Sequence, residues 1–213
     1  MAYYVKEIFY SLQGEGAQMG RPAVFCRFAG CNLWSGGKGD RANAVCGFCD
    51  TDFVGTDGPG GGRYETPEEL ARAARAAWPR SSSLRARPFL VCTGGEPFLQ
   101  LDEALVAAFH EARFEIAVET NGTIPAPCHI DWVCVSPKAN AELAMQSGDE
   151  LKLVFPQEGA EPEHYESLDF RHYFLQPMDG PDREMNTRLA LEYCLRHPQW
   201  RLSLQMHKML GIR

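Results

Sequence analysis

The sequence has no long hydrophobic run, no excess of basic charge and no internal repeat. No apolar stretch approaches the ~18 residues that a membrane-spanning helix needs. Residues 1–10 carry charges where a secretory signal would be uniformly apolar. The formal net charge of −7 argues against general binding to nucleic acid or to anionic lipid surfaces, because both attract basic proteins. We therefore expect a cytoplasmic protein that binds neither nucleic acid nor membrane.

The chain does have enough apolar sequence for one sizeable core. It contains 213 residues, of which 45% are hydrophobic, so we expect a single domain spanning residues 1–213. It also contains eight cysteines. Without a secretory signal, cysteines are usually kept as reduced thiols, which bind metals or pack in the core.

Three of the cysteines, Cys31, Cys46 and Cys49, follow the spacing C-x14-C-x2-C. The C-x2-C pair brings two sulfurs to one metal centre, and the third sulfur comes from a Gly-rich arm. Three thiolate ligands suit a [4Fe-4S] cluster in which the fourth iron stays open to a small molecule.

A structural zinc site is the alternative, because Cys26 extends the pattern to C-x4-C-x14-C-x2-C. Such a site closes all four positions around the ion. The alternation expected of a strand over residues 22–28 places Arg27 on the face opposite Cys26. If Arg27 faces the site, Cys26 is a buried apolar side chain and not a ligand. The spacing alone leaves both possibilities open. Packing roles are expected for Cys92, Cys128, Cys134 and Cys194.

Short apolar strands alternate with helical stretches along most of the chain. This pattern predicts βα units and a mainly parallel sheet with helices outside. A capping box at residues 66–69 opens the first predicted helix, which runs to about residue 78. Strands are expected at residues 22–28, 88–93, 114–118, 132–135, 151–155, 173–176 and 200–205. Further helices are expected at residues 101–113, 162–168 and 183–196.

Polar or Gly-rich clusters follow nearly every predicted strand. In open α/β sheets and α/β barrels, ligands bind at the carboxyl ends of the strands, so we expect the site along this edge. An earlier loop at residues 12–16 exposes backbone donors between two glycines, although a plain hairpin turn explains the same pattern. The clusters are Gly94–Pro97, Glu119–Gly122, Ser136–Lys138 and Pro177–Gly180.

The three cysteines, followed by Gly94-Gly-Glu-Pro97 at the end of the next strand, resemble the radical S-adenosylmethionine (SAM) superfamily. The usual superfamily spacing is C-x3-C-x2-C, so the first gap is longer here. From end to end, the chain is similar to one family, the 7-carboxy-7-deazaguanine synthases of queuosine and deazapurine biosynthesis. Matching segments are Ser11–Gly16, Arg27, Cys49–Thr51, Thr93–Pro97, Glu119–Gly122, Ser136–Lys138 and Ser203–Ile212.

This resemblance implies an α/β fold, namely an incomplete (β/α) barrel of the radical SAM type, in a homodimer. It implies a lyase that converts 6-carboxy-5,6,7,8-tetrahydropterin to 7-carboxy-7-deazaguanine with loss of ammonia. The implied cofactors are a [4Fe-4S] cluster, SAM and Mg²⁺, with an external reductant such as flavodoxin or ferredoxin. Two alternatives are a radical SAM activating enzyme for a glycyl-radical protein and a zinc-stabilised module without enzymatic activity.

The resemblance also implies a role for each group of site residues. Cys31, Cys46 and Cys49 would hold the cluster, and Thr51 would be the protein ligand of Mg²⁺, which retains water in its shell. SAM contacts are implied for Phe48, Asp50, Gly94, Gly95, Glu96, Ser136, Pro137, Lys138, Gln176, Pro177, Met178 and Asp179. Substrate contacts are implied for Leu12, Gln13, Gly14, Glu15, Arg27, Thr93, His207 and Arg213, the last through its α-carboxylate.

Two of these substrate residues have chemistry that suits opposite ends of a carboxylated pterin. Arg27 offers a two-pronged donor for a carboxylate. Glu15 offers an acceptor for amino and ring N–H groups. The alternatives are a structural ion pair for Arg27, a surface position for Lys138 and simple packing for His207.

Overall fold

The computed structural model describes residues 1–79 and 87–213. Its strands form one nine-stranded sheet in the order β3-β1-β2-β4-β5-β6-β7-β8-β9. β1 pairs antiparallel with β2 and β3, and every other neighbouring pair is parallel, as predicted. Within the described sheet β3 and β9 remain as edges, so the barrel is incomplete. The strands are β1 (Tyr3–Leu12), β2 (Pro22–Phe28), β3 (Gly62–Tyr64), β4 (Phe89–Gly94), β5 (Glu115–Thr120), β6 (Trp132–Val135), β7 (Ser147–Phe155), β8 (Asp169–Pro177) and β9 (Trp200–Leu202).

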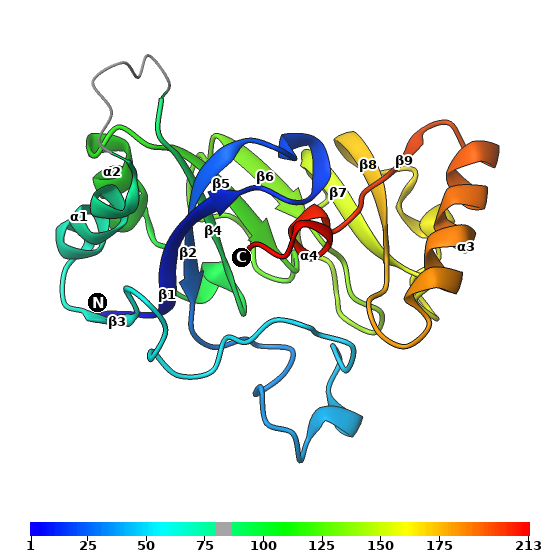
Figure 1. Cartoon of the computed structure of the whole chain (residues 1–213), viewed down its shortest axis with the longest axis horizontal. Coiled ribbons are helices and arrows are strands. Elements are labelled where there is room, and N and C mark those ends of the chain that lie inside the picture. The colour runs from blue at the N-terminus through cyan, green and yellow to red at the C-terminus, as the bar shows by residue number, and fades with distance from the viewer. Residues whose placement is uncertain (80–86) are drawn as a thin grey trace.

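The longer helices lie on the outside of this sheet (Figure 1). α1 and α2 contact each other on one flank, and α3 contacts β8 and β9 at the other end. The predicted capping box is confirmed, since Thr66 Oγ1 accepts from the backbone N–H of Glu69 at 3.3 Å. No described helix has the length and apolar character needed to cross a membrane. The helices are α1 (Pro67–Ala77), α2 (Glu103–Glu111), α3 (Arg183–Arg196) and α4 (Met206–Leu210), with 3-10 turns η1 (Gly16–Gln18), η2 (Arg41–Asn43), η3 (Pro97–Leu99) and η4 (Pro162–Tyr165).

Alternating side chains give β2 two different faces, as predicted. Val24 and Cys26 are fully buried in the core that α1 and α2 cover. Ala23 and Phe25 belong to a separate cluster on the inner face of the sheet. Arg27 shares that inner face and lines the cavity described below. The sheet therefore separates Cys26 from the side on which Arg27 lies.

The loop between β1 and β2 is the connection of an antiparallel hairpin, so the plain hairpin interpretation describes its topology. Two backbone hydrogen bonds close it: Gln13 N–H donates to Arg21 O at 2.9 Å, and Gly20 N–H donates to Gln13 O at 2.7 Å. The same loop also forms part of the cavity wall. The two interpretations of residues 12–16 are therefore compatible.

The structure differs from the expected elements in the Gly-rich and C-terminal segments. A three-residue strand, β3, follows a Gly-rich stretch whose sequence has no period-2 pattern. Residues 162–168 contain only the short turn η4, with Pro162 at its start. The strand expected at residues 200–205 ends at Leu202, and α4 follows where no element was expected.

Candidate functional site

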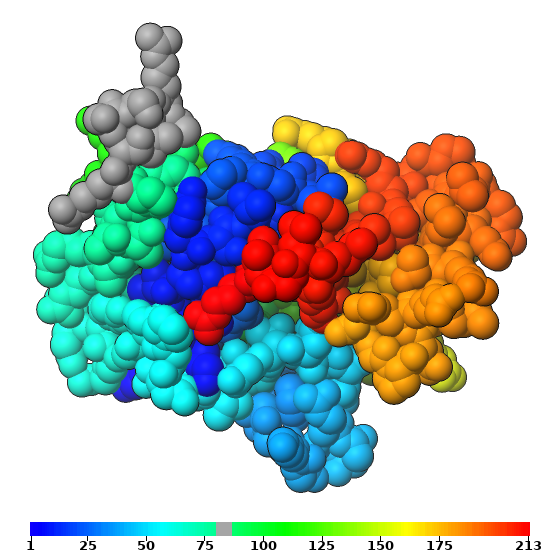
Figure 2. All heavy atoms as spheres, in the orientation of Figure 1, coloured from blue at the N-terminus to red at the C-terminus, as the bar shows by residue number. Residues whose placement is uncertain are grey.

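A cavity of about 340 Å³ opens at the carboxyl ends of the parallel strands. The ends of β4, β5 and β8 contribute to its wall, together with β7 and the loops that follow β1, β2 and β6. In the space-filling view, the C-terminal segment lies across this face between the N-terminal strands and the cysteine-containing segment (Figure 2). The predicted position of the site is therefore where the cavity lies.

Nearly all residues given a role from the sequence line this one cavity. Glu96 and Pro137 do not. Those that do are Leu12, Gln13, Gly14, Glu15, Arg27, Cys31, Cys46, Phe48, Cys49, Asp50, Thr51, Thr93, Gly94, Gly95, Ser136, Lys138, Gln176, Pro177, Met178, Asp179, His207 and Arg213. Lining residues that sequence reasoning gave no role include Glu7, Asp52, Glu119, Lys152, Gln205 and Lys208.

The three motif cysteines share one part of the cavity wall. A hydrogen bond from Cys46 lowers the pKa of Cys49 to about 6, against the opposing effect of burial. Burial raises the pKa of Cys31. Among the described residues, no three His, Cys, Asp or Glu side chains gather as one metal ion requires. In a [4Fe-4S] cluster each cysteine binds a different iron, so the three thiols suit a cluster without sharing one centre.

Cys26 does not join the other three cysteines. Its side chain is fully buried in the core under α1 and α2, and it does not line the cavity. Burial holds the pKa of this thiol well above its usual range, so it stays protonated. The four-cysteine zinc site is therefore wrong for this chain, and the expectation that Cys26 packs as an apolar side chain fits its surroundings.

The long gap in the cysteine motif folds back onto the C-x2-C pair. Arg41 donates to the main-chain oxygens of Gly47 at 3.0 Å and Cys49 at 3.1 Å. Its guanidinium lies over the ring of Trp34, 4.2 Å from the centroid. Trp34 is buried and packs edge-on against Phe53. The insertion thus has a small apolar centre of its own and braces the loop that presents Cys49.

The turn after β4 packs directly against the loop that leads to Cys31. A Cβ added to Gly95 would lie 1.8 Å from Gly30 O, and one added to Gly94 would lie 2.2 Å from Phe28 O. Gly94 also has a φ of +128°, which favours glycine. The two glycines therefore allow a close backbone approach, and they join the turn and the cysteine loop into one packed unit.

Glu96 does not have the position expected for a SAM contact. Its side chain is fully buried and accepts from Phe98 N–H at 3.0 Å, Thr120 Oγ1 at 2.8 Å and Asn121 N–H at 2.8 Å. Burial raises its pKa in spite of these hydrogen bonds. The carboxyl group therefore ties the turn after β4 to the end of β5. Only Gly94 and Gly95 of this motif reach the cavity wall.

Ser136 and Lys138 line the cavity beyond the end of β6, where Lys138 Nζ donates to Ser136 Oγ at 2.7 Å. Burial lowers the pKa of Lys138, so it is not the solvated surface lysine of the alternative interpretation. Pro137 is buried between them and does not line the cavity.

Glu7 of β1 holds two arginines at the cavity wall. Arg27 Nε donates to Glu7 Oε1 at 2.9 Å, and Arg213 Nη2 lies 3.0 Å from Glu7 Oε2. Arg27 therefore forms a structural ion pair, as one of the two interpretations of the sequence expected, but it does so through Nε alone. Among the described residues, no acceptor bonds its two terminal nitrogens. These nitrogens are the pair that a bidentate carboxylate contact requires.

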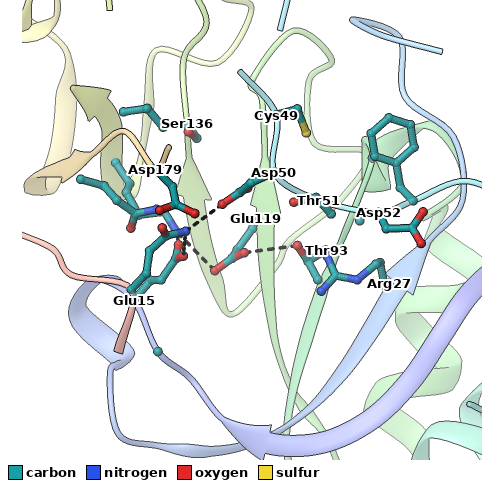
Figure 3. Close-up of a pocket in the computed structure, with 18 of the residues that line it drawn as sticks. Glu15, Arg27, Cys49, Asp50, Thr51, Asp52, Thr93, Glu119, Ser136 and Asp179 are labelled. Atoms are coloured by element: carbon teal, nitrogen blue, oxygen red, sulfur yellow. Dashed lines mark hydrogen bonds and ion pairs between the residues drawn. The ribbon is translucent and has the colours of Figure 1, made fainter. Parts of the chain in front are cut away.

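Thr51 lies between two aspartates on the cavity wall, where its hydroxyl oxygen could be a metal ligand (Figure 3). Asp50 forms an ion pair with Lys208, and Asp52 lies 3.0 Å from Lys6 Nζ. Both carboxylates are thus held by lysines. The Thr51 hydroxyl has the ligand chemistry that Mg²⁺ prefers.

The helix α4 lies on the hairpin loop at the cavity mouth. Met206 N–H donates to Gly14 O at 3.0 Å. A Cβ added to Gly14 would lie 2.4 Å from His207 Nδ1, so the imidazole packs directly on this glycine while it lines the cavity. Ser11 Oγ donates to the main-chain oxygen of Arg213 at 2.6 Å. The C-terminal segment is therefore part of the wall.

A buried ion-pair network forms another part of the wall. Lys152 of β7 pairs with Glu15, and Glu119 at the end of β5 lies between Glu15 and Thr93 (Figure 3). Sequence reasoning gave neither Lys152 nor Glu119 a role. A lysine inside the apolar strand run at residues 151–155 was the available signal, because period-2 alternation places it on the face opposite its leucine neighbours.

Comparison with known proteins gives full-length relatives, although no family model matches the chain. A 7-carboxy-7-deazaguanine synthase from Caulobacter vibrioides is 64% identical over 212 residues, which cover 100% of this chain and 100% of that protein. One from Burkholderia multivorans is 59% identical over 212 residues, also with 100% of both chains covered. The crystal structure of QueE from Escherichia coli matches with a TM-score of 0.68 at 27% identity, covering 97% of this chain and 95% of that chain.

Proposed function

The chain belongs to the 7-carboxy-7-deazaguanine synthase family, and from this premise we propose that its cavity is the active site. The protein is a radical SAM lyase of queuosine and deazapurine biosynthesis that converts 6-carboxy-5,6,7,8-tetrahydropterin to 7-carboxy-7-deazaguanine with loss of ammonia. It uses a [4Fe-4S] cluster, SAM and Mg²⁺. The resemblance inferred from the motifs and the incomplete barrel are both confirmed. The gathering of the motif residues in one cavity supports the assignment of the site.

Cys31, Cys46 and Cys49 would hold the cluster on the cavity wall. With SAM, the cluster supplies the one-electron chemistry that removes a hydrogen atom from the substrate. The chain's own contribution is to fix the thiols. Arg41 holds the carbonyl of Cys49, and Gly95 packs against Gly30 and the side chain of Cys31.

SAM would be held along the strand ends nearest these cysteines. Gly94 and Gly95 bring backbone close to a ligand, and Lys138 offers a buried ammonium for a carboxylate. Of the residues expected here, Glu96 and Pro137 would act through their neighbours and not by direct contact. The remaining contacts are assigned to Phe48, Asp50, Ser136, Gln176, Pro177, Met178 and Asp179.

The substrate would be held by opposite chemistry at its two ends. The terminal nitrogens of Arg27 bind its carboxylate, and Thr51 would hold Mg²⁺ beside the same group. Glu15 accepts from the amino and ring N–H groups. With both ends of the substrate fixed, one substrate hydrogen is presented for abstraction, so that binding energy is used to orient the substrate. Further substrate contacts are assigned to Leu12, Gln13, Gly14, Thr93, His207 and Arg213.

The assembly and its surroundings are part of the same proposal. We propose an external reductant of the flavodoxin or ferredoxin type, because radical SAM chemistry needs an electron donor. We also propose a homodimer, which the resemblance to the family implies, and a cytoplasmic location, which the sequence predicts. Residues 1–213 are assigned to one radical SAM core domain, since one sheet joins their strands.

Alanine substitution of the cysteines tests the cluster assignment. Cys31→Ala, Cys46→Ala and Cys49→Ala should lose iron and sulfide after anaerobic reconstitution and lose turnover. Their circular dichroism should stay that of the wild type, because none of these thiols belongs to the three buried clusters of the sheet. Cys194→Ala on α3 is the matched control and should keep its iron. Full iron content or turnover in any of the three variants would contradict the assignment.

A further inference from the structure

We propose that Lys152 is a positioning residue for the substrate. Together with Glu119, it holds the Glu15 carboxylate where this group accepts from the N–H donors of a 2-amino-4-oxopyrimidine ring. The inference rests on the proposed function, because it takes the pyrimidine edge of the pterin as the partner of Glu15. It adds Lys152, in the middle of β7, and gives Glu119 a role at the end of β5.

The charged groups form one connected network in the cavity. Lys152 Nζ pairs with Glu15 Oε2 and lies 3.4 Å from Glu119 Oε1. Glu119 also accepts from Gln13 Nε2 at 3.0 Å and from Thr93 Oγ1 at 3.2 Å. The Lys152 side chain is only 6% exposed. Gln13, Glu15 and Thr93, all expected at the substrate, are therefore tied through hydrogen bonds and ion pairs to one buried ammonium.

The charge of this network matches a ligand that brings hydrogen-bond donors. Two carboxylates and one ammonium leave one excess negative charge in a buried setting, where an unmatched charge is costly. The 2-amino-4-oxo edge of a pterin supplies N–H donors to that charge. Arg27 lies on the far side of Glu119 from Glu15 (Figure 3), where it meets the carboxylate end. The cavity thus has complementary chemistry for the two ends of the substrate.

Lys152 also keeps Glu15 ionised. Burial alone would raise the pKa of Glu15, but the charge and hydrogen bond of Lys152, with smaller contributions from Gln205 and His207, outweigh burial and lower the pKa. Without Lys152, Glu15 would share the buried wall with Glu119 and no cation between them, so its pKa would rise. The other titratable groups that act on this pair are His207, Glu150, Cys134 and Lys138.

The first test measures substrate binding by calorimetry on anaerobic, SAM-loaded enzyme with Mg²⁺ and no reductant. Lys152→Met should bind 6-carboxy-5,6,7,8-tetrahydropterin about 10- to 100-fold more weakly than the wild type, because a charged hydrogen-bonding group is lost. The preference for this pterin over the matching lumazine, which has a carbonyl in place of the amino group, should shrink in Lys152→Met. Arg188→Met removes an exposed cation on α3 and should leave both affinities unchanged.

The second test is the pH profile of kcat/KM, which a purely structural role would not shift. An ionised Glu15 is required, so activity is present above its pKa and is lost as the pH falls through it. In Lys152→Met the acid limb of the profile, where kcat/KM falls with falling pH, should move to higher pH. In Lys152→Met/Glu119→Gln it should move back toward the wild type, because the second carboxylate is gone.

The outcomes separate this inference from the proposed function. Unchanged pterin affinity and an unchanged acid limb in Lys152→Met would overturn the role of Lys152, provided that the wild type binds the pterin. A wild type that neither binds nor converts the pterin would overturn the proposed function instead. If Lys152→Met does not fold, the double variant is compared with Glu119→Gln, which keeps the cation. The acid limb should then lie at higher pH in the double variant than in Glu119→Gln. Acid limbs at the same pH in these two variants would refute the inference.

Discussion

Arg27 forms an internal ion pair and still has two nitrogens with which it can bind a ligand, because its guanidinium has three nitrogens in one plane. Nε is held by Glu7 at 2.9 Å, which fixes the direction of the two terminal nitrogens. Arg27→Lys keeps the charge, but one ammonium cannot reproduce this fork. We expect KM for the pterin to rise about 10- to 100-fold with a smaller change in kcat and no change in SAM affinity. Steady-state kinetics check this, with Arg188→Lys on α3 as the control, and an unchanged KM would remove Arg27 from the substrate site.

Thr51 makes a separate prediction about the metal. Thr51→Ala removes the hydroxyl that would bind Mg²⁺, so the Mg²⁺ concentration for half-maximal activity should rise severalfold. Thr51→Ser, which keeps the hydroxyl, should restore most of the response. The affinity for SAM should change less than the Mg²⁺ response. Thr187→Ala, on the exposed side of α3, controls for loss of a threonine hydroxyl, and an identical Mg²⁺ titration for Thr51→Ala would exclude this ligand.

Some of these residues are predictable from the sequence and others are not, for physical reasons. The inward direction of Arg27 followed from strict alternation along β2, which the structure preserves. Lys152 lies in a strand whose apolar sequence predicts full burial, and a buried cation there needs partners from distant parts of the chain. Those partners, Glu15 and Glu119, lie 137 and 33 residues away along the chain. Such long-range pairing has no local signal in a single sequence.

At the scale of elements, the turn after β4 and the cysteine loop form a single packed unit. Gly95→Ala would place a Cβ 1.8 Å from Gly30 O and 2.9 Å from the Cβ of Cys31. We expect it to destabilise the fold by about 1–3 kcal/mol and to lower iron incorporation, although Gly95 is not a ligand. Urea unfolding and iron analysis after reconstitution measure both effects.

Gly39→Ala is the matched control for that substitution. Gly39 lies in the long segment between Cys31 and Cys46, and a Cβ added to it meets no atom within 4 Å. Its iron content should equal that of the wild type. Equal iron content in Gly95→Ala and Gly39→Ala would show that the turn after β4 does not brace the cysteine loop.

Among the elements that the sequence predicted, several have a clear local signal, namely strand alternation, a short apolar run or a capping box. β2, β4 and α1 are of this kind. The short helix α4 was missed because five residues are too few to show a helical pattern, and its position depends on Gly14 and Asp50, which lie far away in the sequence. Glu96 and Pro137, which do not line the cavity, are buried in the segments that follow β4 and β6, and the sequence does not specify which way these side chains point.

At the scale of the whole molecule, the site joins the two ends of the chain. The N-terminal hairpin supplies Glu15, the middle of the chain supplies the cysteines and strand ends, and the C-terminal segment supplies His207. Lys208 pairs with both Asp50 and Asp179 and so ties α4 to the cysteine loop and to the end of β8. The cavity proposed as the active site therefore has residues from both ends and the middle of the chain in its wall.

Anaerobic turnover with the pterin tests both the cluster and the reaction. The protein is purified anaerobically, reconstituted with iron and sulfide, and supplied with SAM, Mg²⁺, a reductant and 6-carboxy-5,6,7,8-tetrahydropterin, and the products are followed by mass spectrometry. We expect the wild type to form 7-carboxy-7-deazaguanine and Cys31→Ala, Cys46→Ala and Cys49→Ala to form none. A protein that retains zinc, builds no iron-sulfur cluster and leaves the pterin unchanged would contradict this expectation.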